Sequence, residues 1–505
     1  MTTCIYDTAW LAMVTKEEEG QIRWLFPDSF KAILESQSLD GGFGSRTSDV
    51  DAIMNTMAAL LALSKHGHNP SVAGCPPVAN LQERIAQGGA FLQNVLLSWD
   101  ILSTDHVGFE ILIPCLIDLL YNDGVDVRAF PGYENLIRLN QRKLARFRPE
   151  MLYMPRQTTL LHSLEAFSGK INFDAVAHHL TGGAMLNSPS STAAYLINSS
   201  KWDAEAEAYL RYVAEKGRGL VPSAFPITLF EISWCLSTLL ESGFTVQQLG
   251  EKPIQQLSDF VVKNLKENGG VCGFAPGVLP DADDTAKCIF LLNCIGQRTD
   301  CDRMIEVFED KSHFKTYDLE VTDSFSANCN VLKAMLVAED AARHLPQICK
   351  VLRYLCQIWH DGQLNDKWNL RPQYSMMLLT EALVHVLKRW DQGDLNEIPV
   401  ELMAEQGILS VLSDILDGLL RTQSLEDGGW GGSAEVTGYA LLALKRLASL
   451  PWSLECGDKV DLAIDLATVY LQTREGEWTT PQENWIEKVS YGSRLLSLTY
   501  AVAAL

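Results

Sequence analysis

Three carboxylates lie close together near the middle of the chain, with a spacing that could support proton transfer. Asp281, Asp283 and Asp284 follow Pro280 and precede the apolar run Cys288-Ile289-Phe290-Leu291-Leu292. A proline and a capping aspartate before an apolar run predict the first turn of a helix. One carboxylate is enough to cap that turn, and three repel one another, so a buried cluster would hold at least one proton at neutral pH. A carboxyl held neutral in this way is a proton donor.

The same acidic turn also has a simpler interpretation. The helix macrodipole favours carboxylates at an N-terminus, and clustered acids are common on solvated surfaces. From these three residues alone, a surface helix and a proton donor both remain open.

The totals limit the class of protein. A chain of 505 residues with 47% hydrophobic and 21% charged residues predicts a globular protein of two or three domains. A formal net charge of -22 argues against nucleic acid and against an anionic membrane as partners. The apolar stretch from Ile111 to Leu120 contains Asp118 and is too short to span a bilayer, so we expect no stable membrane insertion. No signal peptide is recognisable, and we expect a cytoplasmic protein. The 12 cysteines form no Cys-x-x-Cys pair, which favours scattered thiols over disulfides or a zinc site.

Helical periodicity dominates the chain, and alternating strand patterns are nearly absent, which predicts an all-α protein. Apolar residues recur at spacings of three and four in segments such as 52–65, 229–241, 374–388 and 436–447.

One phrase recurs where a helical pattern ends and another begins. Gln37-Ser38-Leu39-Asp40-Gly41-Gly42-Phe43-Gly44 returns as Gln423-Ser424-Leu425-Glu426-Asp427-Gly428-Gly429-Trp430-Gly431, with looser copies at 268–274 and 472–478. The glycines permit a tight turn, and repetition at helix junctions predicts stacked helix pairs that close into α/α barrels. Coincidental glycine-rich helix ends are the alternative. The best candidates for a linker between domains are 216–222 and 241–243.

Several stretches together resemble a known family. Pro280-Asp281-Ala282-Asp283-Asp284-Thr285-Ala286 resembles the D-x-D-D motif of class II terpene cyclases, which protonate an alkene to start cyclisation. Four other stretches resemble copalyl diphosphate synthases, in the family's order: Tyr6-Asp7-Thr8-Ala9-Trp10, Leu161-His162-Ser163-Leu164-Glu165, Ser188-Pro189-Ser190-Ser191-Thr192-Ala193 and Val221-Pro222-Ser223-Ala224-Phe225-Pro226. Several motifs in order are more specific than the aspartates alone, and they disfavour the surface helix.

The resemblance implies a fold and a reaction. It implies two α/α barrels, called β and γ, with the active site between them. Residues 1–18 and 241–505 would form the β domain, and residues 19–240 the inserted γ domain. The implied reaction is an isomerisation in which geranylgeranyl diphosphate is cyclised to a bicyclic copalyl-type diphosphate and the diphosphate is retained.

The resemblance also implies roles for individual residues at the acid. Asp283 would be the general acid, and Asp281 and Asp284 would tune its pKa. An asparagine that hydrogen-bonds the acid would be Asn328, with Asn330 as the next choice.

Other implied roles concern the diphosphate. Glu110 matches a glutamate of the family's diphosphate–magnesium region, so we expect Mg²⁺ to bind through the substrate diphosphate. Lys143 and Lys367 match basic residues that hold the diphosphate, and Arg146 could replace Lys143. As lone lysines they could equally be solvated surface groups.

The remaining predicted roles concern the final deprotonation and the stabilisation of the carbocation. His162 matches a histidine that holds a water together with an asparagine in the ent series, but Ser223 stands at the asparagine position, which leaves the stereochemical series and the terminating base open. His162 could also be an interior histidine with satisfied hydrogen bonds. Trp234 is the aromatic residue we expect to stabilise a carbocation in a dry cavity, with a core role as the alternative.

Two other functions remain as alternatives, together with a further domain. A squalene–hopene-type triterpene cyclase shares the barrels and the aspartate motif, and a non-catalytic α/α-barrel scaffold or farnesyltransferase β-like subunit shares the repeats. The sequence contains no D-D-x-x-D cluster, so we expect no release of diphosphate. The apolar helical run at 501–505 leaves open a class I α domain in a longer protein.

Overall fold

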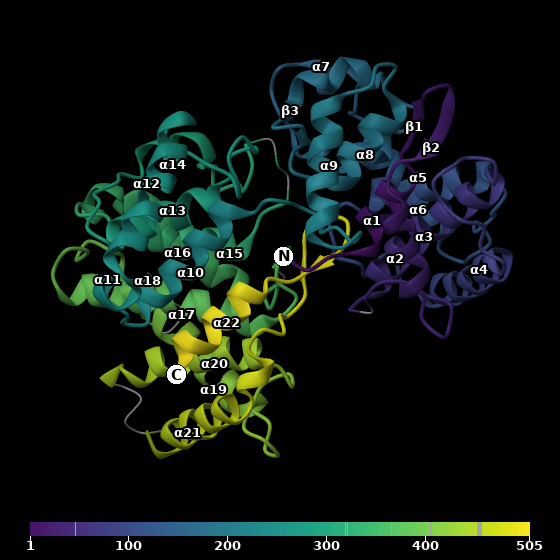
Figure 1. The fold of residues 1–505 in the computed structure, drawn as a ribbon. Coiled ribbons are helices and arrows are strands. Elements are labelled where there is room, and N and C mark those ends of the chain that lie inside the picture. Colours follow the sequence, from purple (N-terminus) through teal and green to yellow (C-terminus); the bar gives the residue numbers. More distant parts are fainter. Residues whose placement is uncertain (46, 319, 321, 365, 405–406, 452–456) are drawn as a thin grey trace. The chain divides into compact units, whose positions relative to one another are not determined.

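The computed structural model describes residues 1–505 except 46, 319, 321, 365, 405–406 and 452–456, and helices make up most of that part (Figure 1). The all-α prediction is therefore confirmed. The strands in the described part form three short antiparallel hairpins, β1 (Thr15–Glu18) with β2 (Gln21–Trp24), β3 (Leu180–Thr181) with β4 (Ala184–Met185), and β5 (Asn484–Trp485) with β6 (Ser490–Tyr491). The chain divides into two compact units: unit 1 contains residues 1–226 and 483–492, and unit 2 contains 227–482 and 493–505.

Unit 1 is built on a closed ring of five inner elements. Each packs on the next and the last packs on the first, in the order α1 (Ile5–Ala12), α3 (Asp49–His68), α5 (Phe109–Asn122), η1 (Thr159–Phe167) and α8 (Pro189–Asn198). Outer helices each cover one member of the ring: α2 (Pro27–Ser36), α4 (Leu81–Ser98), α6 (Tyr133–Leu144) and α9 (Ala204–Lys216). The short elements α7 (Glu150–Tyr153) and η2 (Phe173–His179) pack on each other.

Unit 2 is built on a closed ring of six inner helices. In ring order they are α10 (Thr228–Glu241), α13 (Ala282–Cys294), α15 (Phe325–Val337), α17 (Pro372–Asp391), α20 (Ala434–Ala448) and α22 (Arg494–Ala504), and α22 packs back on α10. Between successive inner helices run the outer helices α12 (Glu251–Glu267), α14 (Asp302–Phe308), α16 (Leu345–His360), α19 (Ile408–Thr422) and α21 (Gly457–Thr473). The remaining short elements are α11 (Val246–Leu249), η3 (Ala341–His344), α18 (Val400–Met403) and η5 (Glu475–Glu477). This alternation of inner and outer helices around a ring is the predicted α/α barrel.

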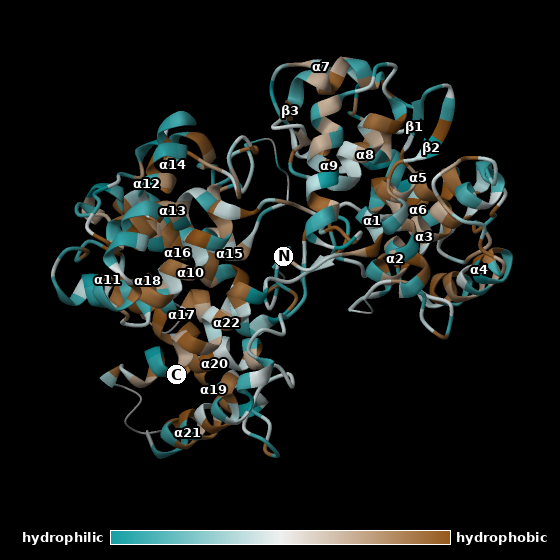
Figure 2. Cartoon of the chain, viewed as in Figure 1, coloured by the Kyte–Doolittle hydropathy of each residue, from teal (hydrophilic) through white to brown (hydrophobic). Residues whose placement is uncertain are grey.

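The hydropathy of the helices explains which of them line the ring. An inner helix has neighbours on nearly every side, so it must be buried nearly all round. In α20, every residue from Ala434 to Leu444 is buried. In the outer helix α12, buried positions such as Ile254, Ser258, Val261 and Leu265 recur at helical spacing along one face only. Figure 2 shows this contrast as hydrophobic brown on α17 and hydrophilic teal on α12.

The repeated glycine-rich phrase connects an outer helix to the next inner helix. In the copy between α19 and α20, the Gln423 side-chain amide donates to the backbone oxygens of Gly428 at 2.8 Å and Ala463 at 2.9 Å. The Trp430 backbone N–H donates to Thr437 Oγ1 on α20 at 3.0 Å. Gly428 has a φ of +78°, a conformation that a residue with a Cβ rarely adopts.

Two of the other copies make an equivalent bond to the next inner helix. Before α3, the Phe43 N–H donates to Thr56 Oγ1 at 3.2 Å, and the Gln37 amide donates to the Gly41 carbonyl at 3.1 Å. Before α13, the Cys272 N–H donates to Thr285 Oγ1 at 3.0 Å. The prediction that these phrases are helix junctions of one kind is confirmed.

The division into units differs from the expected domain boundaries. Residues 1–18 were expected with 241–505, but α1 packs on α2, α3 and α8, and Cys4 forms a backbone bridge with Val221, so this segment lies in unit 1. The division falls at 226/227 rather than 240/241 because α10 is the first inner helix of the second ring. The return of residues 483–492 to unit 1 was not predicted.

Candidate active site

The predicted acid cluster lies at one end of the inner ring of unit 2. Each inner helix is followed by an outer helix that returns the chain, so the inner helices begin at the same end of the barrel. Asp283 lies in the first turn of α13, Tyr374 in the first turn of α17, and Asn330 in the second turn of α15. Residues from separate parts of the sequence therefore lie together at the end of the barrel where the inner helices begin, which is also the positive end of each helix dipole.

Two of the three aspartates are buried and shape the turn. Asp281 is the N-cap of α13, and its carboxylate accepts a hydrogen bond from the Asp284 N–H at 2.7 Å. Burial raises the pKa of Asp281 to about 7. Burial, reinforced by the negative charge of Asp281, raises the pKa of Asp284 well above its usual range. The expectation that crowding would hold a proton in this cluster agrees with these shifts.

Asp283 is the carboxyl of the three that is partly exposed. Burial of its environment raises its pKa to about 6, against the opposing effect of a hydrogen bond from Asn330. The negative charge of Asp366 raises the pKa of Asp283 further, whereas the charges of Lys287 and Lys367 lower it. An acid that is accessible, close to neutrality in pKa and supported by a hydrogen-bond donor has the properties of a general acid.

The asparagine next to the acid is Asn330, and the first choice, Asn328, was wrong. The Asn330 Nδ2 donates to Asp283 Oδ1 at 2.7 Å. Asn328 instead clamps the backbone of Phe314: its Oδ1 accepts from the Phe314 N–H at 2.8 Å, and its Nδ2 donates to the Phe314 oxygen at 2.9 Å. The two positions are separated by about half a helical turn, so they point in different directions, and only Asn330 faces α13.

The loop before α17 brings further charge toward the acid. Asp366, which the sequence did not single out, accepts from the Ser326 N–H at 3.1 Å and the Ser326 hydroxyl at 2.7 Å, so it caps α15. Lys367 is buried, pairs with Glu320 and donates to the Thr322 oxygen at 2.9 Å. These contacts place the charge of Lys367 near Asp283, and its role at the diphosphate stays a prediction.

An aromatic group extends from Trp234 across the ring. The Trp234 Nε1 donates to the Tyr374 hydroxyl at 3.0 Å, and the Phe230 ring lies 4.4 Å from the Trp234 ring. Tyr374 contacts Tyr439 edge-on at 5.2 Å, and Tyr439 contacts Tyr500 at 4.7 Å. The tyrosines lie on α17, α20 and α22, so no spacing in the sequence pointed to them. Trp234 is only 3% exposed, and its contact with a carbocation stays a prediction.

In unit 1, three of the sequence motifs meet in a buried ionic network. Lys488, which is fully buried, donates to Glu165 at 3.1 Å and lies 3.9 Å from Asp7. Its ammonium also donates to the hydroxyls of Ser188 and Ser190 at 2.6 Å each. The motifs that begin at residues 6, 161 and 188 therefore hold the ring of unit 1 together around a lysine from the returning segment.

Glu110 and Lys143, which the sequence predicted together, are paired. Glu110 lies in the first turn of α5, where its Oε2 accepts from the Gly108 N–H at 3.1 Å, and its Oε1 lies 3.4 Å from Lys143 Nζ. The Lys143 side chain is 50% exposed and the Glu110 side chain 18% exposed, so both reach solvent. The Glu487 backbone lies directly against Gly108. Burial raises the pKa of Glu487 to about 7, and no sequence pattern pointed to this residue.

His162 and Ser223 are buried in unit 1. His162 Nδ1 lies 3.3 Å from the Leu186 oxygen, while His162 Nε2 has no hydrogen-bond partner among the described groups. Burial lowers the pKa of His162 well below its usual value, so the ring is neutral. The Ser223 hydroxyl lies 3.7 Å from the Met1 sulfur. A buried ring nitrogen without a protein partner suits a bound water, and a water shared with Ser223 stays a prediction.

The sequence and the fold are similar to those of known proteins. The whole chain is 42% identical to the phyllocladan-16-α-ol synthase of Phomopsis amygdali and 40% identical to the copalyl diphosphate synthase of Talaromyces verruculosus. Its fold is similar to the solved ent-copalyl diphosphate synthase of Streptomyces platensis, with a TM-score of 0.79 at 24% identity, covering 100% of this chain and 95% of that one. The chain is a homologue of these diterpene synthases and has the fold of the solved cyclase. No protein-family model matches it.

The chain spans about half the length of the curated relatives it matches, 51% of the Phomopsis protein and 53% of the Talaromyces protein. Some relatives are named as bifunctional, such as the premutilin synthase of Rhodocybe pseudopiperita. In the described part of the chain, no helix combines the length and the apolar character that a bilayer crossing requires.

Glu110 is the residue through which the sequence predicts a bound magnesium ion, and that role stays a prediction. Among the described residues, no group of three His, Cys, Asp or Glu side chains could hold a metal. Mg²⁺ in enzymes is commonly bound by one or two carboxylates together with substrate phosphates. The carboxylate of Glu110 reaches solvent and suits that mode of binding.

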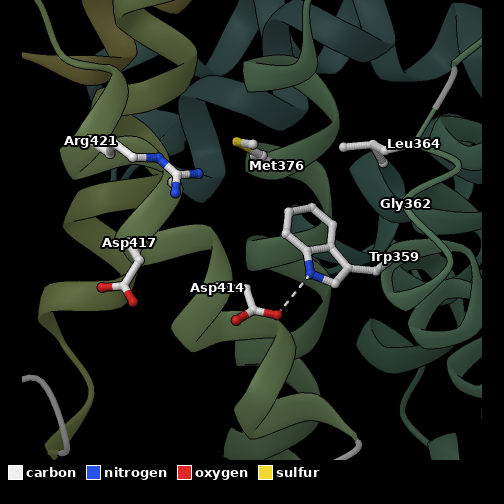
Figure 3. A pocket seen from close by; sticks show the side chains of 8 residues that line it. Trp359, Gly362, Leu364, Met376, Asp414, Asp417 and Arg421 are labelled. Atoms are coloured by element: carbon white, nitrogen blue, oxygen red, sulfur yellow. Dashed lines mark hydrogen bonds between the residues drawn. The ribbon is translucent and has the colours of Figure 1, made fainter.

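A pocket of about 420 Å³ in unit 2 is lined by none of the predicted site residues (Figure 3). Trp359, Leu364 and Met376 form its apolar side, and the α19 residues Asp414, Asp417 and Arg421 face it. The Trp359 Nε1 donates to Asp414 Oδ2 at 3.3 Å.

Proposed function

We propose that this chain is a class II cyclase, an isomerase that converts geranylgeranyl diphosphate into a bicyclic copalyl-type diphosphate. The observation that carries the proposal is the partly exposed carboxyl of Asp283, with its pKa raised to about 6 and its Oδ1 bonded to Asn330 at 2.7 Å. The names of the relatives supply the substrate class.

The reaction begins with one proton transfer. The O–H bond of Asp283 breaks as the electron pair of the terminal alkene forms a new C–H bond, which leaves a tertiary carbocation and the Asp283 carboxylate. Two internal alkenes then attack in turn and close two rings, and loss of a proton from the final cation gives a neutral hydrocarbon skeleton. No oxidant or reductant is required.

The other aspartates act through the charge of Asp283. The raised pKa of Asp284 favours its neutral form, and Asp281 holds the turn through its cap bond. Asn330 stabilises the carboxylate after the proton has left, because its amide donates to the negative oxygen. The acid need not be intrinsically strong if the alkene is held against it.

We assign the diphosphate to the paired Glu110 and Lys143, with Arg146 as the alternative cation and Lys367 as a further candidate. Lys143 offers a flexible, solvent-reaching ammonium that suits a phosphate oxygen. Bound Mg²⁺ would neutralise negative charge on the diphosphate, and Glu110 would orient it. Because the sequence holds no D-D-x-x-D cluster, the diphosphate is retained.

We assign the end of the reaction to a water held by His162 and Ser223. Neutral His162 with its unbonded Nε2 can accept a proton from such a water. Trp234 is the aromatic residue proposed to stabilise the cation, although its exposure is small.

The alternatives are less well supported. The relatives reported above are diterpene synthases by name, which disfavours a squalene–hopene-type enzyme. A non-catalytic scaffold does not explain three carboxyls with raised pKa values at one helix start. If the chain is part of a longer protein, as the length of its relatives suggests, a class I α domain is the partner we propose.

The experiment is product analysis with purified protein. The chain is incubated with geranylgeranyl diphosphate and MgCl₂, and the products are dephosphorylated and identified by gas chromatography–mass spectrometry. A bicyclic alcohol supports the proposal, and its optical rotation assigns the stereochemical series. Recovery of only geranylgeraniol, with squalene cyclised in a parallel assay, would favour the triterpene alternative.

A further inference from the structure

A buried lysine follows the acid by one helical turn. Lys287 lies on α13 four residues after Asp283 and is 3% exposed. Residues four apart on a helix share a face, so the two side chains are neighbours. No sequence pattern assigned a role to this lysine.

Lys287 is held in an unusual way. Its Nζ donates to Ser237 Oγ on α10 at 3.1 Å and lies 5.1 Å from the centre of the Trp234 ring. No carboxylate in the described part of the chain lies within 4.0 Å of it. An ammonium buried without an ion pair is costly, and a hydroxyl and an aromatic face offset only part of that cost.

Other buried lysines of the chain are paired directly. Lys333 pairs with both Glu241 and Glu381, and Lys488 pairs with Glu165. These lysines have evident structural roles as counter-ions. Lys287 has no such partner in its resting contacts, which indicates that its charge serves a state in which negative charge appears beside it.

The charged and titratable groups around α13 determine the electrostatic potential at Lys287 and Asp283. Asp281 and Asp284 lie on the same turn as Asp283, and Cys288 and Cys294 lie further along α13. The groups from other elements are Cys235 and Glu241 of α10, Cys272 of the loop before α13, Cys329 and Lys333 of α15, Tyr374, Glu381 and His385 of α17, and Asp366 and Lys367 of the loop before α17. Glu241 and Glu381 pair with Lys333 and together carry one negative charge more than it balances, which favours the charged form of Lys287 from beyond ion-pair distance. Asp283 is the neighbour of Lys287 whose charge changes in the reaction.

We propose that Lys287 is a positioning residue for proton transfer, whose ammonium, fixed by Ser237 and Trp234, stabilises the Asp283 carboxylate left when the proton moves to the alkene. The proposal rests on the proposed function. Lys287 itself keeps its protons throughout: the O–H bond of Asp283 breaks, the π bond of the alkene is consumed, and a C–H bond forms.

The electrostatic shifts agree with this geometry. Burial lowers the pKa of Lys287 to about 8, so it stays charged over the range in which Asp283, with a pKa of about 6, titrates. The ammonium also occupies space over the Trp234 ring, which makes Trp234 a support for Lys287.

The test compares Lys287→Met and Lys287→Arg with wild type over pH 5 to 9, following bicyclic product. Without the ammonium, Asp283 is a weaker acid that keeps its proton to higher pH. We expect Lys287→Met to lower the plateau of kcat at least tenfold and to move the basic limb of the kcat profile upward by about one pH unit. Lys287→Arg should restore most of both. Lys445→Met is the control, because Lys445 is a partly buried lysine of unit 2 whose hydrogen bonds within the described residues go to the carbonyls of Ala504 and Leu505; it should leave the profile unchanged.

A second readout does not need turnover. Infrared difference spectra of protein labelled with ¹³C at the aspartate carboxyls, with Asp283→Asn as the reference, report the titration of Asp283 directly. An upward shift in Lys287→Met supports the proposal even if geranylgeranyl diphosphate proves to be the wrong substrate. An unchanged Asp283 titration in a folded Lys287→Met protein would overturn it, as would a loss of kcat with no movement of the basic limb. Failure of wild type to cyclise the substrate would instead count against the proposed function.

Discussion

Asn330 donates to Asp283 Oδ1 at 2.7 Å, and the two side chains come from α15 and α13, which are neighbours in the inner ring of unit 2. This bond ties the acid to a second helix and favours its charged form, because the amide hydrogen faces the oxygen that becomes negative. It gives the acid a fixed direction, which a residue in the first turn of a helix would otherwise lack.

Asn330→Ala should reduce catalysis without unfolding the chain. Hydrogen bonds to charged groups contribute about 1.5–3 kcal/mol, so kcat should fall roughly 10- to 100-fold. The measurement is steady-state kinetics with geranylgeranyl diphosphate, together with thermal unfolding. A variant with wild-type kcat would show that the bond has no role in the reaction.

Asn328→Ala should have the opposite pattern and serves as the matched partner of Asn330→Ala. Its loss leaves the buried N–H and C=O of Phe314 without partners, which should cost about 2–4 kcal/mol in the free energy of unfolding. Urea unfolding measures this cost. If Asn328→Ala were as stable as wild type but inactive, the first choice from the sequence would have been right after all.

The contrast between these two asparagines shows where sequence reasoning ended. The aspartate motif, the helical class and the glycine-rich junctions are local patterns, and the structure confirms the class and the junctions. Which asparagine faces the acid depends on the rotation of α15 against α13, and no local pattern fixes that rotation. Asp366 and Tyr374 were missed for the same reason, because only ring closure brings their segments to Asp283. The returning segment with Lys488 belongs to unit 1 through buried charge, which composition does not reveal.

The rate should depend on the protonated form of Asp283. Since its pKa is raised to about 6 and the active form carries the proton, kcat/KM should fall with increasing pH above about 6, tenfold per unit at the limit. A pH profile in buffers of constant ionic strength measures this. A kcat/KM that rises through the same range would mean that the essential group acts as a base.

Lys488→Met should destabilise unit 1 severely. It would leave Asp7 and Glu165, both fully or almost fully buried, without their cation, and removing one partner of a buried pair costs about 3–5 kcal/mol. Chemical unfolding provides the measurement, and Lys16→Met is the control. Lys16 pairs with Glu207 at the surface of the same unit, so its loss should cost less than about 1 kcal/mol. Equal stability of the two variants would show that the network is dispensable.

The most direct test of the account is the product formed by Asp283→Asn. The amide has nearly the same shape as the carboxyl but cannot donate an acidic proton, so the variant should fold like wild type and return geranylgeranyl diphosphate unchanged, at least 1,000-fold below the wild-type rate, where roughly 4 kcal/mol of barrier corresponds to that factor. Bicyclic diphosphate formed by Asp283→Asn at a rate near that of wild type would contradict the assignment of Asp283 as the proton donor.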